Sequence, residues 1–339
     1  MDNIIEEGSK DKPESEPVRR KKFFSSWKGY MIKYTIIWFV ILIIFFRSIF
    51  IYTGNWPSMI VVESNSMQRS EDEAFLGTID MGDMVLVKDI ENKDDVISYM
   101  KGKRIGHETY GEYGDVIIYR KNGYTDTTPV IHRAIVWLEY NETSNSYDIP
   151  ELKHHEKGDE RDWYVVGEDD RWYNLAQTVV LRDIGNDHED VNIKLGGILS
   201  SFALSGVKPH SGFITLGDNN LGIIDQGALP DGHGGRVRPV VPEWVIGKAR
   251  GELPGLGLIK IQNSDPESLE MAPSNSWSMF FLSAVLLFVI FFGIPICLFI
   301  IEILLKKRRA KIEKEGKEED MPLSQESIEE GNNKPPSHD

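Results

Sequence analysis

The sequence predicts a mainly β extracytoplasmic domain, a folded sheet or barrel, connected to two transmembrane helices. Three observations favour this class. Two long apolar runs lie near the ends of the 339-residue chain, short β-branched and aromatic runs recur between them, and no convincing amphipathic helix occurs between residues 53 and 278. A hydrophobic fraction of 41% and a charged fraction of 27% exclude a wholly disordered or fibrous chain.

The first apolar run predicts a transmembrane helix over residues 34–52. Tyr34–Phe46 carries no charge, and apolar residues resume after Arg47, whose head group can extend to the membrane interface. A basic flank precedes the run, but no small-x-small cleavage site follows it, so we expect an uncleaved anchor rather than a removed signal peptide. A buried core helix is the alternative, because the run is short for a bilayer core of ~30 Å.

The second apolar run predicts a transmembrane helix over residues 279–305. Met279–Ile301 is 23 residues without a charge, and about 20 helical residues span a bilayer. Pro295 lies inside the run, where a membrane helix tolerates it. The one cysteine, Cys297, lies there too, which excludes a disulfide scaffold and a Cys-rich zinc site and argues against a cysteine protease.

Basic residues flank both runs on the side of the chain termini. They are Arg19, Arg20, Lys21, Lys22, Lys28, Lys33, Lys306, Lys307, Arg308, Arg309 and Lys311. This bias predicts that the two end segments, 1–33 and 306–339, are cytoplasmic and that residues 53–278 lie outside the cytoplasm. The outer tails, 1–22 and 310–339, have almost no large apolar residues, and we expect them to be disordered.

The acidity of the chain belongs to its middle segment. The whole chain has 38 Lys and Arg against 53 Asp and Glu, a net charge of −15. Residues 53–278 hold 21 basic and 37 acidic residues, a net charge of −16, so the remainder is nearly neutral. This balance argues against nucleic acid as the main partner, because phosphate binding needs a basic face.

Eight short runs predict the strands of the middle segment. Each is rich in β-branched or aromatic residues between Gly, Asn or Asp clusters. The runs are Met59–Val62, Met84–Val87, Val116–Tyr119, Val130–Trp137, Asp162–Val166, Phe213–Leu216, Glu243–Lys248 and Leu258–Ile261. The stretch from about 140 to 210 is polar with few strand signals, which predicts a large insertion in a smaller core.

The sequence contains no metal or cofactor motif. Eight histidines are spread along the chain without an H-E-x-x-H pattern or cysteine partners. There is no P-loop, no G-x-G-x-x-G after a strand and no G-x-S-x-G elbow. We therefore expect neither a metal nor a cofactor.

Serine, histidine and aspartate residues are the best candidates for chemistry. Ser64 and Ser66 follow an apolar strand in MIVVESNSMQ, so one hydroxyl could attack a carbonyl while the other binds the oxyanion. His132 in VIHRAIV is the natural proton acceptor, and Asp218 or Asp225 in FITLGDNNLGIIDQG could orient its ring. Taken singly, the serines and the GDNN segment are also typical of turns, and His132 is typical of a hydrogen-bonded core residue.

Together these patches resemble, as an ordered series, the archaeal and endoplasmic-reticulum type of signal peptidase I, a membrane-bound serine protease. The His-Arg pair in the fourth block distinguishes this type from the bacterial type, which has a lysine base. The blocks are IVVESNSM (60–67), MGDMVLV (81–87), GDVIIYR (114–120), PVIHRAI (129–135), FITLGDNN (213–220) and VIGKARGELPGLGLIKI (245–261). They leave residues 140–210 unexplained.

The resemblance implies a role for each candidate residue. Ser66 would be the nucleophile and His132 the general base. Asp225 would match the later aspartate that orients His132, and Asp218 would be a second acidic residue that supports the site. Ser64 matches an oxyanion-hole donor, alongside the Ser66 backbone N–H. The implied fold is the signal-peptidase-like, mostly β peptidase fold with an apolar face near the membrane.

The resemblance also implies an enzyme, a serine endopeptidase that removes signal peptides from secretory preproteins through an acyl-enzyme at the extracytoplasmic membrane surface. Its partners would be secretory preproteins, the lipid bilayer and the protein-translocation machinery. The strand 59–64 is our candidate for one wall of the substrate site, because an extended peptide can add to a sheet edge. Shallow apolar pockets there would accept small side chains.

Three departures from the family pattern leave alternatives open. S-M-Q-R follows where the family has S-M-x-P after Ser66, Leu216 replaces a lysine before Gly217, and the spacing from Asp218 to Asp225 is one residue longer. One alternative is a catalytically inactive, signal-peptidase-like subunit that is anchored in the membrane and serves binding or assembly. Another is a two-span receptor whose acidic ectodomain binds a cationic ligand.

Overall fold

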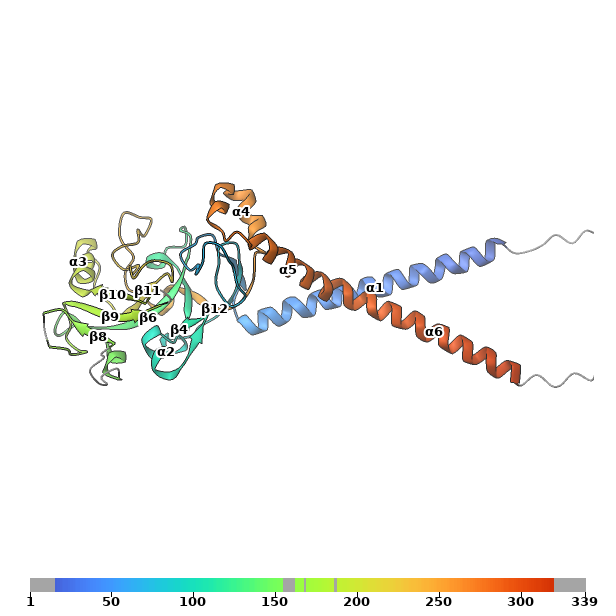
Figure 1. The fold of residues 1–339 in the computed structure, drawn as a ribbon, viewed down its shortest axis with the longest axis horizontal. Helices are drawn as coiled ribbons and strands as arrows, with labels where there is room; N and C mark the ends of the chain where they lie inside the picture. The colour runs from blue at the N-terminus through green and yellow to red at the C-terminus, as the bar shows by residue number, and fades with distance from the viewer. Residues whose placement is uncertain (1–15, 155–161, 168, 186–187, 320–339) are drawn as a thin grey trace, which may run out of the picture. The chain divides into compact units, whose positions relative to one another are not determined.

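The computed structural model describes residues 16–154, 162–167, 169–185 and 188–319. The described chain divides into two compact units. One unit is Ile44–Leu287, which contains the described strands, and the other joins the helical residues that precede and follow it (Figure 1). Each unit is considered by itself below.

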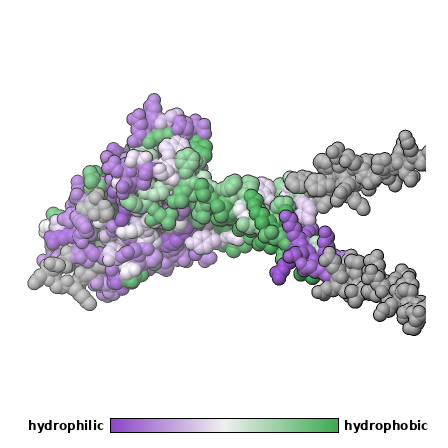
Figure 2. Space-filling model, turned by 45° about the vertical axis from the view of Figure 1, so that its right-hand side comes forward, coloured by the Kyte–Doolittle hydropathy of each residue, from purple (hydrophilic) through white to green (hydrophobic). Residues whose placement is uncertain are grey.

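Two long helical stretches account for the apolar runs. The first is α1 (Glu16–Thr53), and the second consists of α5 (Ser276–Phe288), a π-helical turn (Val289–Gly293) and α6 (Ile294–Glu319). Of the described residues, Lys28–Thr53 and Ser276–Gly316 are the two helical stretches long and apolar enough to cross a membrane. Figure 2 shows apolar side chains over these helical segments. The predicted apolar helices are therefore confirmed in length and composition.

The π-helical turn has a cause in the sequence. Pro295 lies two residues after it, and proline has no N–H to continue the α-helical hydrogen-bond ladder. The N–H of Ile294 instead donates to the carbonyl of Val289, five residues earlier. A one-turn bulge is a common way for a helix to accommodate such an interruption, so the helix continues through Pro295.

A single carboxylate in the second apolar stretch is paired within the helical unit. Glu302 on α6 accepts a hydrogen bond from the Tyr34 hydroxyl of α1 at 2.8 Å and forms ion pairs with Lys33 and Lys306. An ionised side chain is costly in an apolar environment unless it is paired, so these partners explain how Glu302 fits there.

The predicted disorder of the outer tails is wrong for residues 16–22 and 310–319, which are helical. Residues 1–15 and 320–339 lie outside the described chain. The helices extend into these tails because helix formation is cooperative. Once the apolar run has nucleated a helix, adjoining charged residues with good helix propensity continue it. The pair of Lys311 and Glu315, at 3.6 Å, adds the favourable i,i+4 spacing.

The strands of the described domain form one main antiparallel sheet and two smaller ones. The main sheet has seven strands in the order β1-β2-β12-β5-β6-β11, with β7 also paired to β6. Its strands are β1 (Met59–Val61), β2 (Met84–Lys88), β5 (Val116–Tyr119), β6 (Val130–Asn141), β7 (Ser146–Asp148), β11 (Gly212–Leu216) and β12 (Val245–Leu253). A mainly β domain was predicted, and this coarse class is confirmed.

The remaining elements lie around this sheet. The second sheet consists of β8 (Trp163–Val165), β9 (Thr178–Ile184) and β10 (Glu189–Lys194), and a small hairpin consists of β3 (Glu108–Thr109) and β4 (Glu112–Tyr113). Short helices are α2 (Tyr99–Ile105), α3 (Leu195–Ser205) and α4 (Leu258–Ser264), with 3-10 turns at Lys93–Asp95, Lys121–Gly123, Pro150–His154, Pro242–Trp244 and Pro266–Met271.

Two local predictions are wrong. The predicted strand Leu258–Ile261 is the first turn of α4, because its two buried side chains, Leu258 and Ile261, have the i,i+3 spacing of a helix face. The stretch 140–210 is not poor in strands, since it contains the end of β6 and all of β7 to β10. The apolar pattern did not predict these strands because charged residues interrupt it, as Arg182 and Asp183 do in β9.

The insertion shares a core with the main sheet. Ile135, Val136 and Leu138 of β6 pack in one buried cluster with Trp163 of β8 and Phe202 of α3. β6 is 12 residues long, so its second half supports the insertion while its first half, which carries His132, lies between β5 and β11 in the main sheet. The insertion is therefore a structural extension of the domain and not a separate appendage.

Asp83, in the turn before β2, adds a pH-dependent term to the stability of this domain. Its buried carboxylate accepts the N–H groups of Asp80 and Gly255, each at 2.9 Å. Burial raises the pKa of Asp83 from 3.8 to about 7 in spite of these two hydrogen bonds. A raised folded-state pKa favours the protonated folded form, so this contribution is complete below about pH 4 and is lost as the pH rises through 7.

Asp83→Asn is expected to remove this pH dependence, because an amide does not titrate. The lost term amounts to roughly 4 kcal/mol across the interval. Thermal unfolding of the parent and the variant in detergent, from pH 4 to 8, measures it. The stability of the parent relative to the variant should fall as the pH rises, and a difference that is constant with pH would contradict the assignment.

Candidate active site

The two candidate serines lie in a turn directly after β1. Val62 still pairs with the segment before β2: its N–H donates to the Asp83 carbonyl, and its carbonyl accepts the N–H of Gly82. The chain then turns, and the Oγ atoms of Ser64 and Ser66 come within 3.2 Å of each other. The two hydroxyls therefore meet as predicted, but through a turn rather than through the same-face spacing of a strand.

His132 is the inward-facing imidazole next to this turn. It lies on β6, opposite Ile117 of β5, and only 5% of the residue is exposed. Its Nε2 atom is 2.9 Å from the Ser66 Oγ. Because β6 is paired with β5 on one side and β11 on the other, it holds the His132 ring in place next to the half-buried Ser66 hydroxyl.

Asp225 completes the contact from the loop after β11. Its N–H donates to the carbonyl of Thr215 at 2.9 Å, which returns the loop to the end of the strand. Both carboxylate oxygens of Asp225 are 2.8 Å from the Nδ1 atom of His132. The structure thus brings Ser66, His132 and Asp225 into one hydrogen-bonded series, although 93 residues separate the last two.

Asp218 has a different partner. Both of its oxygens accept hydrogen bonds from the guanidinium of Arg133, at 2.8 and 2.5 Å, and both side chains are buried. The remaining donors of Arg133 face backbone carbonyls of the β3–β4 hairpin, including that of Gly114 at 3.1 Å. The sequence left open which aspartate contacts His132. In the structure Asp225 does so, and Asp218 anchors the loop after β11 to Arg133.

The anchored loop holds the nucleophile turn in place. Asn219 donates its N–H to the Ser66 carbonyl at 2.9 Å and its side-chain amide to the Asn65 carbonyl at 3.0 Å. Gly217 allows this approach, because a Cβ there would lie 2.6 Å from the Ser66 carbonyl oxygen and 2.7 Å from the His132 Nε2. A larger residue at position 217 would push the serine turn and the imidazole apart.

The departures from the family pattern have defined places in the structure. Arg69, in the S-M-Q-R segment, pairs with Glu112 at 2.7 Å and so ties the loop after the nucleophile to the β3–β4 hairpin. Leu216 is a buried residue of β11. The longer spacing between Asp218 and Asp225 is absorbed within the loop, since Asp225 still reaches His132.

Two further polar side chains contact Asp225, and sequence reasoning missed both. The Tyr119 hydroxyl donates to the Asp225 Oδ2 at 2.7 Å, and the Thr215 hydroxyl donates to the same atom at 2.6 Å. Burial, followed by the nearby Asp225 charge, raises the pKa of Tyr119 well above its usual value, so the phenol keeps its proton. The available signal was a hydroxyl residue in each of two otherwise apolar runs, VIIY and FITL.

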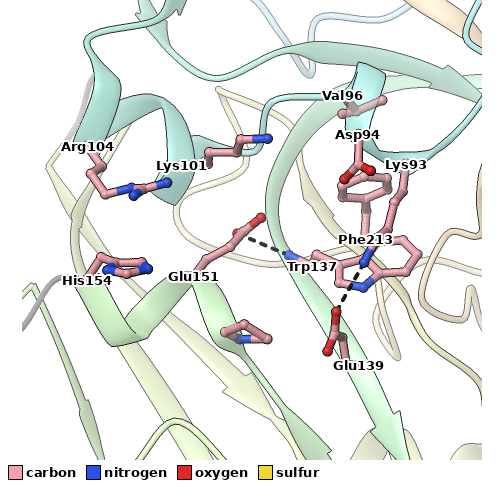
Figure 3. Close-up of a pocket in the computed structure, with 11 residues that line it drawn as sticks. Lys93, Asp94, Val96, Lys101, Arg104, Trp137, Glu139, Glu151, His154 and Phe213 are labelled. Carbon is pink, nitrogen blue, oxygen red and sulfur yellow. Dashed lines mark hydrogen bonds and ion pairs between the residues drawn. The ribbon is translucent and has the colours of Figure 1, made fainter.

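A hollow elsewhere in the domain does not overlap this site. It has a volume of about 250 Å³ and lies between α2, Pro150–His154 and the second half of β6 (Figure 3). There the half-buried carboxylate of Glu151 accepts hydrogen bonds from the Ser98 hydroxyl at 2.7 Å and from the backbone N–H of Trp137 at 3.3 Å. None of the five candidate residues lines the hollow.

No protein-family model matches the chain. No curated protein matches it either. The ordered sequence blocks and the contacts among Ser66, His132 and Asp225 are therefore the observations that point to a function.

Proposed function

We propose that the chain is a signal peptidase I-like serine endopeptidase that cleaves signal peptides from secretory preproteins at the extracytoplasmic membrane surface. The observation that carries the proposal is the hydrogen-bonded series Ser66 Oγ, His132 Nε2, His132 Nδ1 and Asp225, with distances of 2.9 and 2.8 Å. Nucleophile, base and orienting acid are each within the reach that proton transfer requires.

His132 would begin the reaction by taking the Ser66 proton as the serine oxygen attacks the scissile carbonyl. Asp225 would hold the Nδ1–H of the ring, so that Nε2 is the free acceptor, and would stabilise the imidazolium that forms. His132 would then protonate the leaving amine. Water would hydrolyse the acyl-enzyme by the same path, with His132 again as the base.

The oxyanion would form beside Ser64 and the backbone of Ser66. The Ser64 hydroxyl is exposed and lies 3.2 Å from the Ser66 Oγ. Within the described part of the chain, the Ser66 N–H has no hydrogen-bond acceptor. These two donors suit a charge that develops one bond from the attacked carbon, where removal of a single donor commonly costs about 10²–10³-fold in rate.

The edge of the main sheet supplies a surface for an extended substrate. Among the strands that the structure describes, β1 pairs only with β2, and it leads directly into the serine turn. A peptide that adds along β1 would deliver its backbone carbonyl to Ser66, with specificity from alternate side chains. Two apolar helices in the same chain would hold the domain at the membrane and raise the effective concentration of a membrane-bound signal peptide.

The topology belongs to the same proposal. Basic residues at the tail side of both apolar helices favour cytoplasmic termini and an extracytoplasmic domain. This arrangement would place Ser66 on the side of the membrane where the cleavage region of a translocated preprotein emerges. The inactive-subunit alternative rests on the altered spacing around Asp225 and on the large insertion; the contact between Asp225 and His132 supports a catalytic site in spite of that spacing.

Processing of a preprotein by the full chain in lipid vesicles tests the proposal. A preprotein with small residues before the cleavage site should be cut at one bond, which N-terminal sequencing of the product identifies. The same preprotein with Trp at those positions is the matched control and should remain uncut. Intact preprotein after incubation with the folded chain would overturn the proposed function.

A further inference from the structure

We propose that Tyr119 and Thr215 are positioning residues whose hydroxyls donate hydrogen bonds to the Asp225 carboxylate and hold it turned toward His132. The inference deepens the proposed function and rests on it for its kinetic consequences. Its structural part concerns only how a buried carboxylate is held. That part can be measured in a chain without a nucleophile.

Three adjacent strands direct one side chain each at the same carboxylate. β5 and β11 lie on either side of β6, which carries His132. Ile117 of β5 lies opposite His132, so Tyr119, two residues further along, faces the same side. Thr215 of β11 lies opposite Ala134, which is two residues from His132 and also on that side. The sheet register therefore brings both hydroxyls to Asp225.

The hydroxyl protons have defined destinations. Gln226 donates its side-chain amide to the Thr215 Oγ1 at 3.0 Å and accepts the Thr215 N–H at 2.9 Å. Because Thr215 already accepts one hydrogen bond, its single proton is free to be donated, and Asp225 Oδ2 at 2.6 Å is nearer than the Tyr119 oxygen at 3.3 Å. Tyr119 directs its own proton to the same oxygen at 2.7 Å.

The Tyr119 and Thr215 hydroxyls occupy positions beside Asp225 where a Lys or Arg side chain could otherwise pair with a buried carboxylate. Asp225 is 3% exposed, and Tyr119 and Thr215 are 0% exposed. The groups that face it are His132 from β6, Tyr119 from β5 and Thr215 from β11, and no Lys or Arg side chain of the described residues is bonded to it. A buried carboxylate without a cation stays ionised only when several donors hydrogen-bond to it.

Loss of the two hydroxyls should therefore have a directional effect. Without them the carboxylate binds a proton more readily, and a protonated Asp225 cannot stabilise the imidazolium of His132. If Asp225 instead remains ionised, its more concentrated charge favours protonation of His132, which removes the base. Both routes abolish activity at a higher pH than in the parent, so the sign of the expected change is the same.

The test compares Thr215→Val and Tyr119→Phe, singly and together, with Thr215→Ser, which keeps the hydroxyl. Processing is measured from pH 5 to 9. The double variant should move the acid limb upward by about one pH unit and lower kcat near neutrality by about tenfold, with little change in KM. Thr215→Ser should restore most of the parental profile. An unmoved acid limb in the folded double variant, or an equal shift in Thr215→Ser, would overturn the inference.

A second readout separates this inference from the proposed function. In the Ser66→Ala background, the Nδ1 proton of His132 can be followed by NMR without any turnover. In the Ser66→Ala chain with both hydroxyls its resonance should lie downfield, and loss of the Tyr119 and Thr215 hydroxyls should move it, upfield if Asp225 takes up a proton and further downfield if Asp225 stays ionised. An unchanged resonance would overturn the inference even if the parent chain processes preproteins. A changed resonance, together with a parent chain that processes no preprotein, would overturn the proposed function alone.

Discussion

Replacement of Ser66 by alanine is expected to lower preprotein processing by about 10⁴-fold or more. The Ser66 Oγ is bonded to the His132 Nε2 and lies near the Ser64 Oγ, and the substitution removes the atom that would attack. The backbone contacts of the turn, including Asn219 to the Ser66 carbonyl, do not involve that atom, so the fold should persist. Single-turnover cleavage in vesicles measures the loss, and thermal unfolding verifies the fold.

Ser64→Ala is the matched control for this prediction. It removes a hydroxyl two residues away but keeps the nucleophile and the base. The expected loss is that of one oxyanion donor, about 10²–10³-fold, with residual cleavage at the same bond. Equal processing by Ser66→Ala and the parent would show that the attacking group lies elsewhere.

Asp225→Asn is expected to produce the second largest loss, on the order of 10⁴-fold in kcat. Asparagine can present an N–H to the Nδ1 of His132, which would then become an acceptor and leave the proton on Nε2. A ring in that tautomer cannot take the Ser66 proton. The size would be unchanged, so the effect should appear in turnover and not in stability.

Asp218→Asn distinguishes the two aspartates. It leaves His132 and its partner intact but weakens the buried ion pair with Arg133, whose other contacts are backbone carbonyls. Breaking a buried pair commonly costs about 3–5 kcal/mol. The variant should therefore unfold at a lower temperature and keep more turnover than Asp225→Asn. Normal processing by Asp225→Asn, with turnover lost in Asp218→Asn, would reverse the two roles.

The sequence allowed prediction of those features that depend on local pattern. Two apolar runs gave two long apolar helices, and most aliphatic runs gave the strands of the main sheet. The order of blocks also singled out the serine turn, His132 and the aspartate loop. These features were accessible because periodicity and turn residues are properties of short segments.

The features that sequence reasoning missed depend on packing between distant segments. Asp218 pairs with Arg133, which is adjacent to His132 on β6 and therefore points to the opposite side of the strand, and this leaves Asp225 as the contact of His132. Tyr119 and Thr215 looked like ordinary strand residues, because their role arises only when β5, β6 and β11 lie side by side. The strands of 140–210 needed the tertiary core to override their charged residues.

A thiol in place of the nucleophile tests most directly whether Ser66, His132 and Asp225 act as a unit. The chain has one cysteine, so Ser66→Cys combined with Cys297→Ser leaves a single thiol in the site. The alkylation rate of this thiol is measured against pH, with and without His132→Ala. The account predicts fast alkylation at about pH 6 when His132 is present, because its imidazolium stabilises the thiolate. Without His132 the alkylation rate should rise with a midpoint at about pH 8.5, as for an ordinary thiol. Identical pH dependence in the two proteins would contradict the account.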